Sequence, residues 1–534
     1  MTTYNLSELI EQTCDAVPDR LAMITEQRRL TYRELDRRAN RLAHHFRSAG
    51  LGPGDMIGLH LHNGTEYIEA MLAAFKIRAV PVNINYRYVE NELEQLYRYT
   101  DLVALVFHRC FARVVTPVTQ RLPAIRHLLS VDDGSDAELP EHVIDYESAL
   151  GREPDLRSFG GRSSHDLYVT CTGGTTGLPK AVVWRHEDLF FGAFNGGDIT
   201  GGQGPVSDPE QLVDRATQGP SLVQLGLAPL MHVTGHWAVL AFLIGGGTNV
   251  LAPPGSLDPA RIWALIAEHE VNLLALVGDA MARPLIDEYA QHPVDVPTLW
   301  AIGSGGARIS PSTKERINRI LPTVALLDGL GSSETGVLGR NLSGAGKASN
   351  GRFPIDPTTT VLDDQLRPMA PGSGVVGTLA RRGHLPLGYY NDEAKTKAVF
   401  VEIDGQRWVL PGDMAILEAD STITLCGRGS GCINTGGEKV FPEEVEQVLI
   451  DHPNVADAVV VGRPDERWGE HVVAIVQTST DDELTLSQLQ DYTRRHLAGY
   501  KLPRELILVD TVQRMPSGKP DLRWAKGLLR AGPS

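Results

Sequence analysis

Short apolar runs alternate with amphipathic stretches along most of this chain, and this alternation restricts the possible architecture more than any other feature. The runs VALVF (103–107), LLALV (273–277) and VVGTLA (375–380) are mostly apolar and do not alternate regularly with polar residues. Strands of this kind are buried on both faces, which is typical of sheets covered by helices. The sequence therefore predicts an α/β fold of layered subdomains.

One predicted helix covers residues 31–47. Its apolar face carries Leu35, Ala39, Leu42, Ala43 and Phe46. Thr31 and Glu34 have the spacing of a capping box, and Gly50 follows the segment as a stop signal. The pattern predicts an amphipathic helix with its apolar face in a core.

The character of the sequence changes near residue 427. At 534 residues the chain is long enough for about three structural units. A Gly/Ser-rich stretch is followed by a helix start at Pro442. Further strand-like or helical segments lie at 456–462, 471–477, 486–497 and 505–510. We expect a large N-terminal domain over 1–428 and a smaller, mobile α+β domain over 429–534.

Charge and cysteine content narrow the class of protein. The formal net charge of −16 argues against nucleic acid as the main partner, because phosphate recognition needs a basic surface. Five cysteines without framework spacing indicate reduced thiols rather than disulfides. The first residues lack the pattern of a signal peptide, and no apolar run approaches the about 20 residues of a membrane span. These features predict a cytoplasmic protein with no integral membrane segment.

Two segments are rich in Gly, Asp and Pro and read as long loops. They cover residues 196–220 and 342–352. Loops of this length are uncommon in compact domains unless they have a function. Each is expected to be either a mobile substrate lid or a solvated insertion.

Residues 172–180 read TGGTTGLPK, which has the parts of a polyphosphate-binding loop. Its glycines let the backbone approach an anion, its threonines offer hydroxyls, and Lys180 supplies positive charge. The loop is not a Walker A motif, because Pro179 stands where a glycine belongs and Ala181 replaces the magnesium-binding Ser or Thr. Pro179 also disfavours a helix that begins at the phosphate. By itself, the stretch is also compatible with a glycine-rich structural turn.

Other motifs follow this loop in order along the chain. They are LAPLMHVTG (227–235), GSGGAR (303–308), DGLGSSETG (328–336), LPGDMA (410–415), GRGSGCINTGGEKVFPEEVE (427–446) and MPSGKPDLRWAK (515–526). Together with the loop, this set resembles the signatures of the adenylate-forming enzymes, which include acyl-CoA synthetases, luciferases and the adenylation domains of peptide synthetases. The resemblance spans almost the whole chain.

Three further stretches resemble a narrower branch of that family. VVWRHEDLF (182–190), VGDAMARPLIDE (277–288) and SGKPDLRWAK (517–526) are similar to segments of the actinobacterial acyl-CoA synthetases that activate steroid side chains, terpenoid acids and related lipids. This likeness implies a bulky or long carboxylic acid as substrate.

The resemblance implies a two-step reaction with ATP, Mg²⁺ and CoA. The carboxylate attacks the α-phosphate to give acyl-AMP and pyrophosphate, and a thiol then displaces AMP. Lys519 would bridge the two anions of the first step. Glu334 would bind magnesium directly or through water, with help from Thr175. His232 would gate the acyl pocket or orient the carboxylate, unless it only packs in the core.

The resemblance also assigns the nucleotide site. Asp413 would accept hydrogen bonds from the ribose. Arg428 would contact ribose or phosphate, or would form only an interdomain ion pair. The ATP- and AMP-binding residues would be Thr172, Gly173, Gly174, Thr175, Thr176, Gly177, Lys180, Gly306, Ala307, Arg308, Asp328, Gly329, Leu330, Gly331, Ser332, Ser333, Asp413 and Arg428.

The acyl pocket would be built mainly from small residues. Its members would be His232, Val233, Gly278, Gly303, Ser304, Gly305 and Leu330. Residues 231–237 contain no aspartate to pair with an α-amino group, which argues against an amino-acid substrate. The small side chains at 303–305 leave room for a bulky or long acid.

The sequence departs from the family pattern at its hinge. The hinge would comprise Ser430 and Gly431, where the family usually has Asp or Lys at the second position; glycine still supplies backbone freedom. Gly437, Glu438 and Lys439 would enter the site for thioester formation. Leu330 replaces the aromatic residue that commonly packs on adenine.

Three functions remain open from the sequence. The first is an acid–CoA ligase that performs both half-reactions. The second is an adenylating enzyme that passes its product to a carrier protein or a separate transferase, and the altered hinge keeps this alternative in consideration. The third is an inactive nucleotide-binding protein, which the joint presence of Lys180, Glu334, Asp413 and Lys519 opposes. A homodimer is compatible with each.

Overall fold

The predicted strand segments form sheets in the structure. It is a computed structural model that describes residues 3–172, 180–199, 201–307, 309–344, 351–428, 431–435, 438–465, 469–479, 484–497, 499–515 and 520–531. The runs at 103–107 and 273–277 lie in β5 (Leu102–His108) and β12 (Leu273–Leu276). Both belong to mainly parallel sheets, as the apolar pattern predicts.

The first sheet has the strand order β19-β9-β8-β4-β3-β5-β6-β7. Its other strands are β3 (Met56–His60), β4 (Val80–Asn83), β6 (His127–Val131), β7 (Ile144–Asp145), β8 (Leu167–Thr172), β9 (Lys180–Arg185) and β19 (Gly388–Tyr389). The strands from β8 to β7 run parallel, whereas β8, β9 and β19 pair antiparallel. A strand from far along the chain, β19, thus completes the edge beside β9.

The second sheet has the order β15-β14-β13-β12-β10-β11-β1-β2. Its remaining strands are β1 (Leu21–Ile24), β2 (Arg29–Thr31), β10 (Val223–Gly226), β11 (Thr248–Leu251), β13 (Ala301–Ser304), β14 (Ala325–Ser332) and β15 (Gly336–Gly344). Strands β13 and β14 run parallel, and β14 turns back into β15 as an antiparallel pair. Residues 303–307 and 328–334 therefore lie at neighbouring ends of this sheet.

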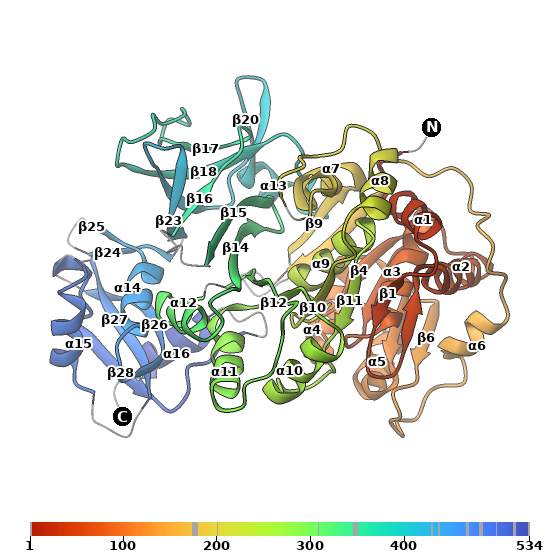
Figure 1. The fold of residues 1–534 in the computed structure, drawn as a ribbon, viewed down its shortest axis with the longest axis horizontal. Helices are drawn as coiled ribbons and strands as arrows, with labels where there is room; N and C mark the ends of the chain where they lie inside the picture. Colours follow the sequence, from red (N-terminus) through yellow and green to blue (C-terminus); the bar gives the residue numbers. More distant parts are fainter. Residues whose placement is uncertain are drawn as a thin grey trace.

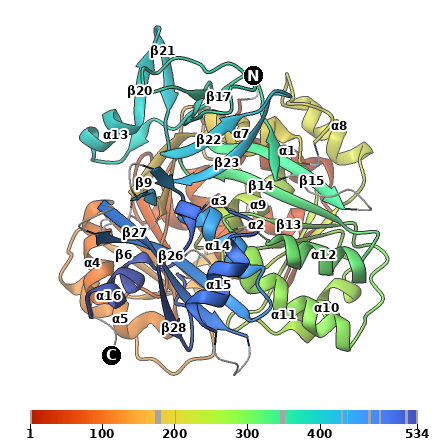
Figure 2. The same ribbon diagram turned by 90° about the vertical axis from the view of Figure 1, so that its left-hand side faces the viewer.

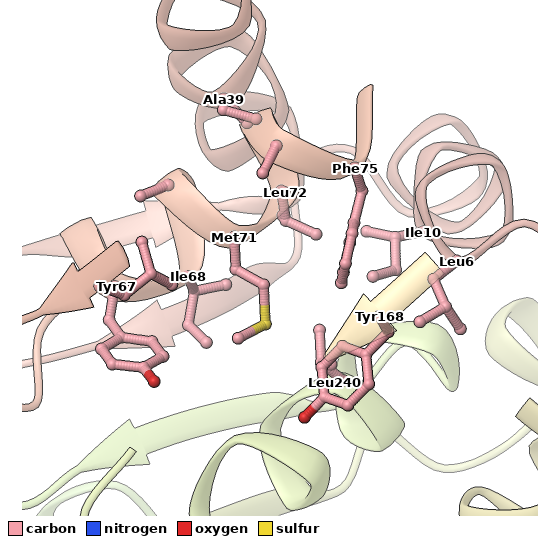
Figure 3. Packing of buried hydrophobic residues seen from close by; sticks show 14 of the residues in the cluster. Leu6, Ile10, Ala39, Tyr67, Ile68, Met71, Leu72, Phe75, Tyr168 and Leu240 are labelled. Atoms are coloured by element: carbon pink, nitrogen blue, oxygen red, sulfur yellow. The ribbon is translucent and has the colours of Figure 1, made fainter. Parts of the chain in front are cut away.

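Every residue of the helix α3 (Thr65–Lys76) except the half-buried Glu66 is buried, including Glu69 and Lys76. Figure 3 shows its Met71 and Phe75 pointing toward Tyr168 of β8 and Leu240 of α9 (Val233–Ile244), which belong to one apolar cluster with Tyr67. A helix buried on all sides belongs to the interior rather than to the surface of a domain. It joins the cores of the two sheets.

The other helices surround these sheets. They are α1 (Leu6–Ala16), α2 (Tyr32–Ser48), α4 (Glu90–Tyr99), α5 (Ala112–Gln120), α6 (Tyr146–Gly151), α7 (His186–Ala193), α8 (Glu210–Gln218), α10 (Pro259–Glu268), α11 (Gly278–Gln291), α12 (Pro311–Ile320) and α13 (Glu393–Val399). The predicted capping box is present at α2, where Thr31 and Glu34 each bond the other's backbone N–H. Its five predicted apolar residues are buried.

A third, antiparallel sheet follows, at the top of Figure 1. It comprises β16 (Arg352–Pro354), β17 (Thr359–Leu362), β18 (Val376–Arg382), β20 (Phe400–Ile403), β21 (Gln406–Val409), β22 (Asp413–Leu417) and β23 (Thr422–Arg428). The run at 375–380 forms β18 as a strand, but in this antiparallel sheet. Its apolar pattern alone does not distinguish the two kinds of sheet.

The C-terminal elements lie at the end of the molecule opposite β6 and α6, and Figure 2 views them face-on. They are β24 (Ile433–Thr435), β25 (Glu438–Val440), α14 (Pro442–Ile450), β26 (Val455–Asp465), β27 (Gly469–Thr478), α15 (Leu486–Thr493), β28 (Glu505–Val509) and α16 (Leu522–Ala531). Separate apolar clusters lie on β26 and β27. The expected α+β character is present, while the boundary at 428 stays a prediction.

The expectation of two long loops is wrong in part. Within residues 196–220 the chain forms α8, whose Leu212 and Ala216 are buried. The surrounding Gly and Pro residues obscured this short amphipathic pattern. The segment 342–352 overlaps β15 at one end and β16 at the other, and residues 345–350 lie outside the described part.

A buried ion network holds α3 to its neighbours. Lys76 is 2% exposed, and its Nζ lies 2.5 Å from Glu11 of α1 and 2.7 Å from Asp36 of α2. Arg162 also donates to Glu11. Burial alone would raise the pKa of Glu11, but Lys76 and Arg162 outweigh it and lower that pKa to about 2.

We expect Lys76→Met to lower the free energy of unfolding by about 3–5 kcal/mol at pH 7, because it removes the cation that two buried carboxylates share and leaves each with one arginine only. A carboxylate with a lowered pKa stabilises the fold above its unfolded pKa, and this contribution is lost as pH falls through the folded value. The difference between wild type and variant should therefore shrink from about pH 4.5 toward about pH 2. Urea unfolding at several pH values measures it.

The matched control is Lys397→Met. The Lys397 side chain is 75% exposed and pairs with Glu393 at 2.7 Å. Such a surface pair contributes little, so the control should change stability by less than about 1 kcal/mol. Equal effects of the two substitutions would contradict the assigned role of the buried network.

Candidate functional site

The glycine-threonine segment connects two paired strands. Strands β8 and β9 are antiparallel, with Thr172 opposite Lys180 in register. The side chain of Asn83 braces the end of β8, accepting from Cys171 N at 2.7 Å and donating to Cys171 O at 2.9 Å. Lys180 begins a strand rather than a helix, in keeping with the effect expected of Pro179. The predicted phosphate-binding residues Gly173, Gly174, Thr175, Thr176 and Gly177 lie outside the described residues.

Glu334 lies in the turn between β14 and β15, and its side chain meets groups from three segments. Ser333 Oγ donates to Oε2 at 2.8 Å, and the Tyr389 phenol donates to Oε1 at 2.9 Å. Lys180 Nζ lies 3.7 Å from the same Oε1. The structure thus brings together two predicted residues, Lys180 and Glu334, at the end of the β8–β9 hairpin.

Two buried side chains, Trp184 and Arg381, donate hydrogen bonds to backbone carbonyls in and next to the Glu334 turn. The sequence did not predict either contact. Trp184 Nε1 donates to Ser333 O at 2.9 Å. The buried Arg381 guanidinium donates to Thr335 O at 2.5 Å and to Val337 O at 2.7 Å. These are contacts between strands distant in the chain, so no local motif points to them.

The predicted adenine-side residues gather at the ends of β13 and β14. Ser304 Oγ accepts from Gly278 N at 2.9 Å and donates to Ala307 O at 2.7 Å. Asp328 pairs with Ser304 in the sheet register, and its carboxylate accepts from Lys314 Nζ at 2.6 Å. Sequence reasoning missed Lys314, a helix residue in no motif.

The remaining predicted nucleotide residues that the structure describes lie in β14 or in the turn after β13. Gly329, Leu330, Gly331 and Ser332 complete β14, Gly306 lies in the turn after β13, and Arg308 is outside the described residues. Leu330 is half-buried against the apolar cluster of the third sheet. An added Cβ at Gly331 would lie 2.2 Å from Gly336 O, so this position accepts only glycine without a shift.

The predicted ribose contact is at the start of a strand. Asp413 begins β22 and pairs in register with Arg428, the last residue of β23. Backbone pairing therefore brings these two predicted residues side by side, although the Arg428 side chain lies outside the described part.

The predicted acyl residues come from neighbouring segments. His232 is the N-cap of α9 and Val233 is its first residue. A Cβ added at Gly305 would lie 3.0 Å from Thr234 Cγ2, and one added at Gly303 would lie 3.7 Å from Leu273 Cδ1. With Gly278 hydrogen-bonded to Ser304, the glycines of this group meet at the carboxyl ends of β12 and β13, beside the start of α9.

A buried polar network lies next to this group. His236 shares hydrogen bonds with Leu230 O through Nδ1, at 2.8 Å, and with the Tyr168 hydroxyl through Nε2. Trp237 Nε1 donates to the same hydroxyl at 2.9 Å. Burial lowers the pKa of His236 to about 4, so this imidazole is neutral at pH 7. The network supports α9 against β8.

The predicted hinge and late-acting residues are only partly described. Gly431 has φ outside the left-handed range, and an added Cβ there would contact nothing within 4 Å. Glycine is therefore not required for this conformation. Glu438 and Lys439 start β25, with only their backbone described. Ser430, Gly437 and Lys519 lie outside the described residues.

The described fold, with two mainly parallel sheets, an antiparallel sheet and a C-terminal α+β region, carries Lys180 and Glu334 at one end of the β8–β9 hairpin. The chain belongs to the AMP-binding enzyme family, whose sequence profile matches residues 10–390; the profile of the AMP-binding enzyme C-terminal domain matches residues 444–519. The family predicted from the motifs is thereby confirmed.

Curated relatives match over nearly the full chain. A 3-oxocholest-4-en-26-oate–CoA ligase of Rhodococcus rhodochrous is 45% identical over 531 residues, covering 98% of this chain and 95% of the relative. A medium/long-chain-fatty-acid–CoA/3-oxocholest-4-en-26-oate–CoA ligase of Mycobacterium marinum is 43% identical over 538 residues, covering 99% and 97%.

Solved structures show the same fold. The anthranilate CoA ligase AuaEII in complex with anthranoyl-AMP superposes with a TM-score of 0.86 at 21% identity, covering 99% of both chains. ATP-bound MatB from Rhodopseudomonas palustris gives 0.82 at 22% identity, covering 98% of this chain and 99% of its own. The predicted α/β fold with a large N-terminal and a smaller C-terminal domain is confirmed. In the described part of the chain, no helix has the length and apolar character needed to cross a membrane.

Proposed function

We propose that this protein is an ATP-dependent, AMP-forming acyl-CoA synthetase. It activates a steroid side-chain acid or a medium- to long-chain fatty acid and transfers the acyl group to CoA. The observation that carries the proposal is the approach of Lys180 and Glu334 to 3.7 Å at the end of the β8–β9 hairpin. The relatives named as CoA ligases, matched over nearly the full chain, support the acceptor and the acid.

The first step must bring two anions together. Lys180, at the end of the hairpin, would neutralise the leaving pyrophosphate, and Lys519 would bridge the carboxylate and the α-phosphate as a compact cation. Asp413 would hold the ribose through its hydroxyls. Because Lys180 and Asp413 lie on different strands, β9 and β22, the nucleotide would be oriented before the acid attacks.

The residues at the Glu334 turn fit a magnesium ion. Glu334 is 8% exposed and offers a carboxylate already oriented by two hydroxyls, and carboxylate oxygens are hard ligands that magnesium prefers. No cluster of three or more metal-ligating side chains occurs in the described part of the chain. Such a donor set suits magnesium held jointly by one carboxylate and substrate phosphates, where the ion neutralises phosphate charge.

The acid pocket would lie at the meeting point of Gly278, Gly303 and Gly305. These positions contribute no side chains, which leaves width for a ring system or a long chain. His232 is the N-cap of α9, and Thr234 of the same helix lies next to Gly305. The proposal therefore favours bulky lipid acids over amino acids.

The test incubates the protein with Mg-ATP, CoA and single acids: 3-oxocholest-4-en-26-oate, octanoate, palmitate, benzoate and phenylalanine. We expect acyl-CoA, AMP and pyrophosphate in equal amounts with the steroid or the fatty acids, detected by mass spectrometry. Acyl-AMP that accumulates without acyl-CoA would favour transfer to a carrier protein instead. Absence of AMP formation with every acid would contradict the proposal.

The proposal includes a cytoplasmic location, where ATP and CoA are supplied, and allows a homodimer. Fractionation of the native host and light scattering of the purified protein measure these two properties. Neither result alters the assignment of the reaction.

A further inference from the structure

Tyr389 makes a hydrogen bond that no sequence motif considered above anticipates. Its phenol donates to Glu334 Oε1 at 2.9 Å, while Ser333 Oγ donates to Oε2 at 2.8 Å. One hydroxyl therefore acts on each oxygen of the carboxylate. This pair of contacts determines the plane in which the carboxylate lies.

Contacts of the Tyr389 backbone and ring fix the position of its phenol. Tyr389 is 6% exposed and pairs with Val182 of β9, and its backbone N–H donates to Thr396 Oγ1 at 2.9 Å. Its ring packs edge-on against Phe400, with centroids 5.9 Å apart. A buried aromatic ring fixed at both backbone and side chain provides a donor with little freedom to move.

The same ring lies beside the predicted phosphate cation. Lys180 Nζ is 5.6 Å from the Tyr389 ring centroid and 3.7 Å from Glu334 Oε1. At these distances the phenol makes the hydrogen bond to Oε1, and the ammonium makes only a longer ion pair. Tyr389 therefore lies beside both the predicted metal-binding carboxylate and the predicted phosphate-binding lysine.

We propose that Tyr389 is a positioning residue for the metal-dependent step, holding the Glu334 carboxylate in the orientation that binds Mg-ATP. The inference rests on the proposed function, in which Glu334 is the magnesium ligand. It requires no contact between Tyr389 and substrate. Carboxylates that bind metals are commonly oriented by hydrogen bonds of this kind, and removal of such a partner weakens the metal site.

The test removes only the hydroxyl. Tyr389→Phe keeps the ring and its packing, and Mn²⁺ serves as the probe for magnesium, with α,β-methylene-ATP present. We expect the Kd for Mn²⁺, measured by electron paramagnetic resonance, to rise by about 10- to 100-fold. In the acid–CoA ligase assay, the Mg²⁺ concentration for half-maximal rate should rise by a similar factor, with a smaller change in rate at saturating Mg²⁺.

The neighbouring tyrosine is a matched control. The Tyr390 phenol donates to the exposed Asp101 at 2.9 Å and has no contact with Glu334 among those of the described residues. Tyr390→Phe should leave the Kd for Mn²⁺ unchanged. In a Glu334→Gln background, Tyr389→Phe should add no further loss, because two residues that act on one metal are coupled.

A second variant separates the hydroxyl from the ring. Tyr389→Ala removes both, so equal weakening of Mn²⁺ binding by the Phe and Ala variants would support the proposal. Weakening by the Ala variant alone would overturn it, because packing would then be the cause. Mn²⁺ binding unaltered by Tyr389→Phe but lost in Glu334→Gln would overturn it and leave the proposed function intact. Mn²⁺ binding unaltered by Glu334→Gln would instead contradict the metal site of the proposed function.

Discussion

A Glu334→Gln enzyme is expected to lose about 100-fold or more of kcat/KM for acyl-AMP formation, the range found when one preorganised electrostatic group is removed. The substitution keeps the size of the side chain but removes the charge next to Lys180, 3.7 Å away. The amide is a poorer magnesium ligand, and its NH₂ would face one of the hydroxyls of Ser333 and Tyr389 that donate to the carboxylate.

Acid-dependent exchange of pyrophosphate into ATP measures this effect without the CoA step. Raising the Mg²⁺ concentration should recover only part of the rate. Glu393→Gln is the control, because its side chain is 81% exposed and pairs only with Lys397 among the described residues. A Glu334→Gln enzyme with wild-type exchange would refute the assigned role.

A Lys519→Met enzyme is expected to lose about 100- to 1,000-fold of the adenylation rate, again by comparison with other electrostatic sites. The lysine would offset the repulsion between the acid's carboxylate and the α-phosphate, and methionine retains a similar length without charge. The residue lies outside the described part, in the segment 516–519 that precedes Pro520. Its assignment therefore rests on the SGKPDLR motif.

The two half-reactions separate this role from a general loss of folding. Synthetic acyl-AMP supplied with CoA bypasses the first step, so Lys519→Met should form acyl-CoA from it at close to the wild-type rate. Lys526→Met, an exposed position on α16, should affect neither step. Equal loss of both half-reactions in Lys519→Met would contradict a role restricted to adenylation.

Much of the fold could be predicted because its signals are local. The capping box at Thr31 and the apolar face of α2 are both read from a single stretch, and both are present. The helix α8 was missed because its nine residues lie between Gly- and Pro-rich segments. The antiparallel sheet around β18 could not be told from a parallel one, since partners of a strand are set by distant segments.

In the candidate site, too, the residues marked by local motifs were predicted, whereas those held by contacts between distant segments were not. Motifs indicated Lys180 and Glu334, which the structure places at one end of the hairpin. Tyr389, Arg381 and Trp184 were missed because their contacts with the Glu334 turn join residues 46 to 149 positions apart. The GYY sequence at 388–390 follows no strand-length apolar run, so it offered no signal for the two-residue strand β19.

The burial of α3 on all sides has a consequence for synthesis on the ribosome. This helix is complete at residue 76, but its partner Tyr168 is made much later and Leu240 later still. Until about 170 further residues have emerged from the ribosome, Tyr67, Met71 and their neighbours lack part of the apolar partners that bury them in the folded protein. The nascent chain must therefore carry an exposed apolar helix through about a third of its translation, a period in which chaperones would shield it from aggregation.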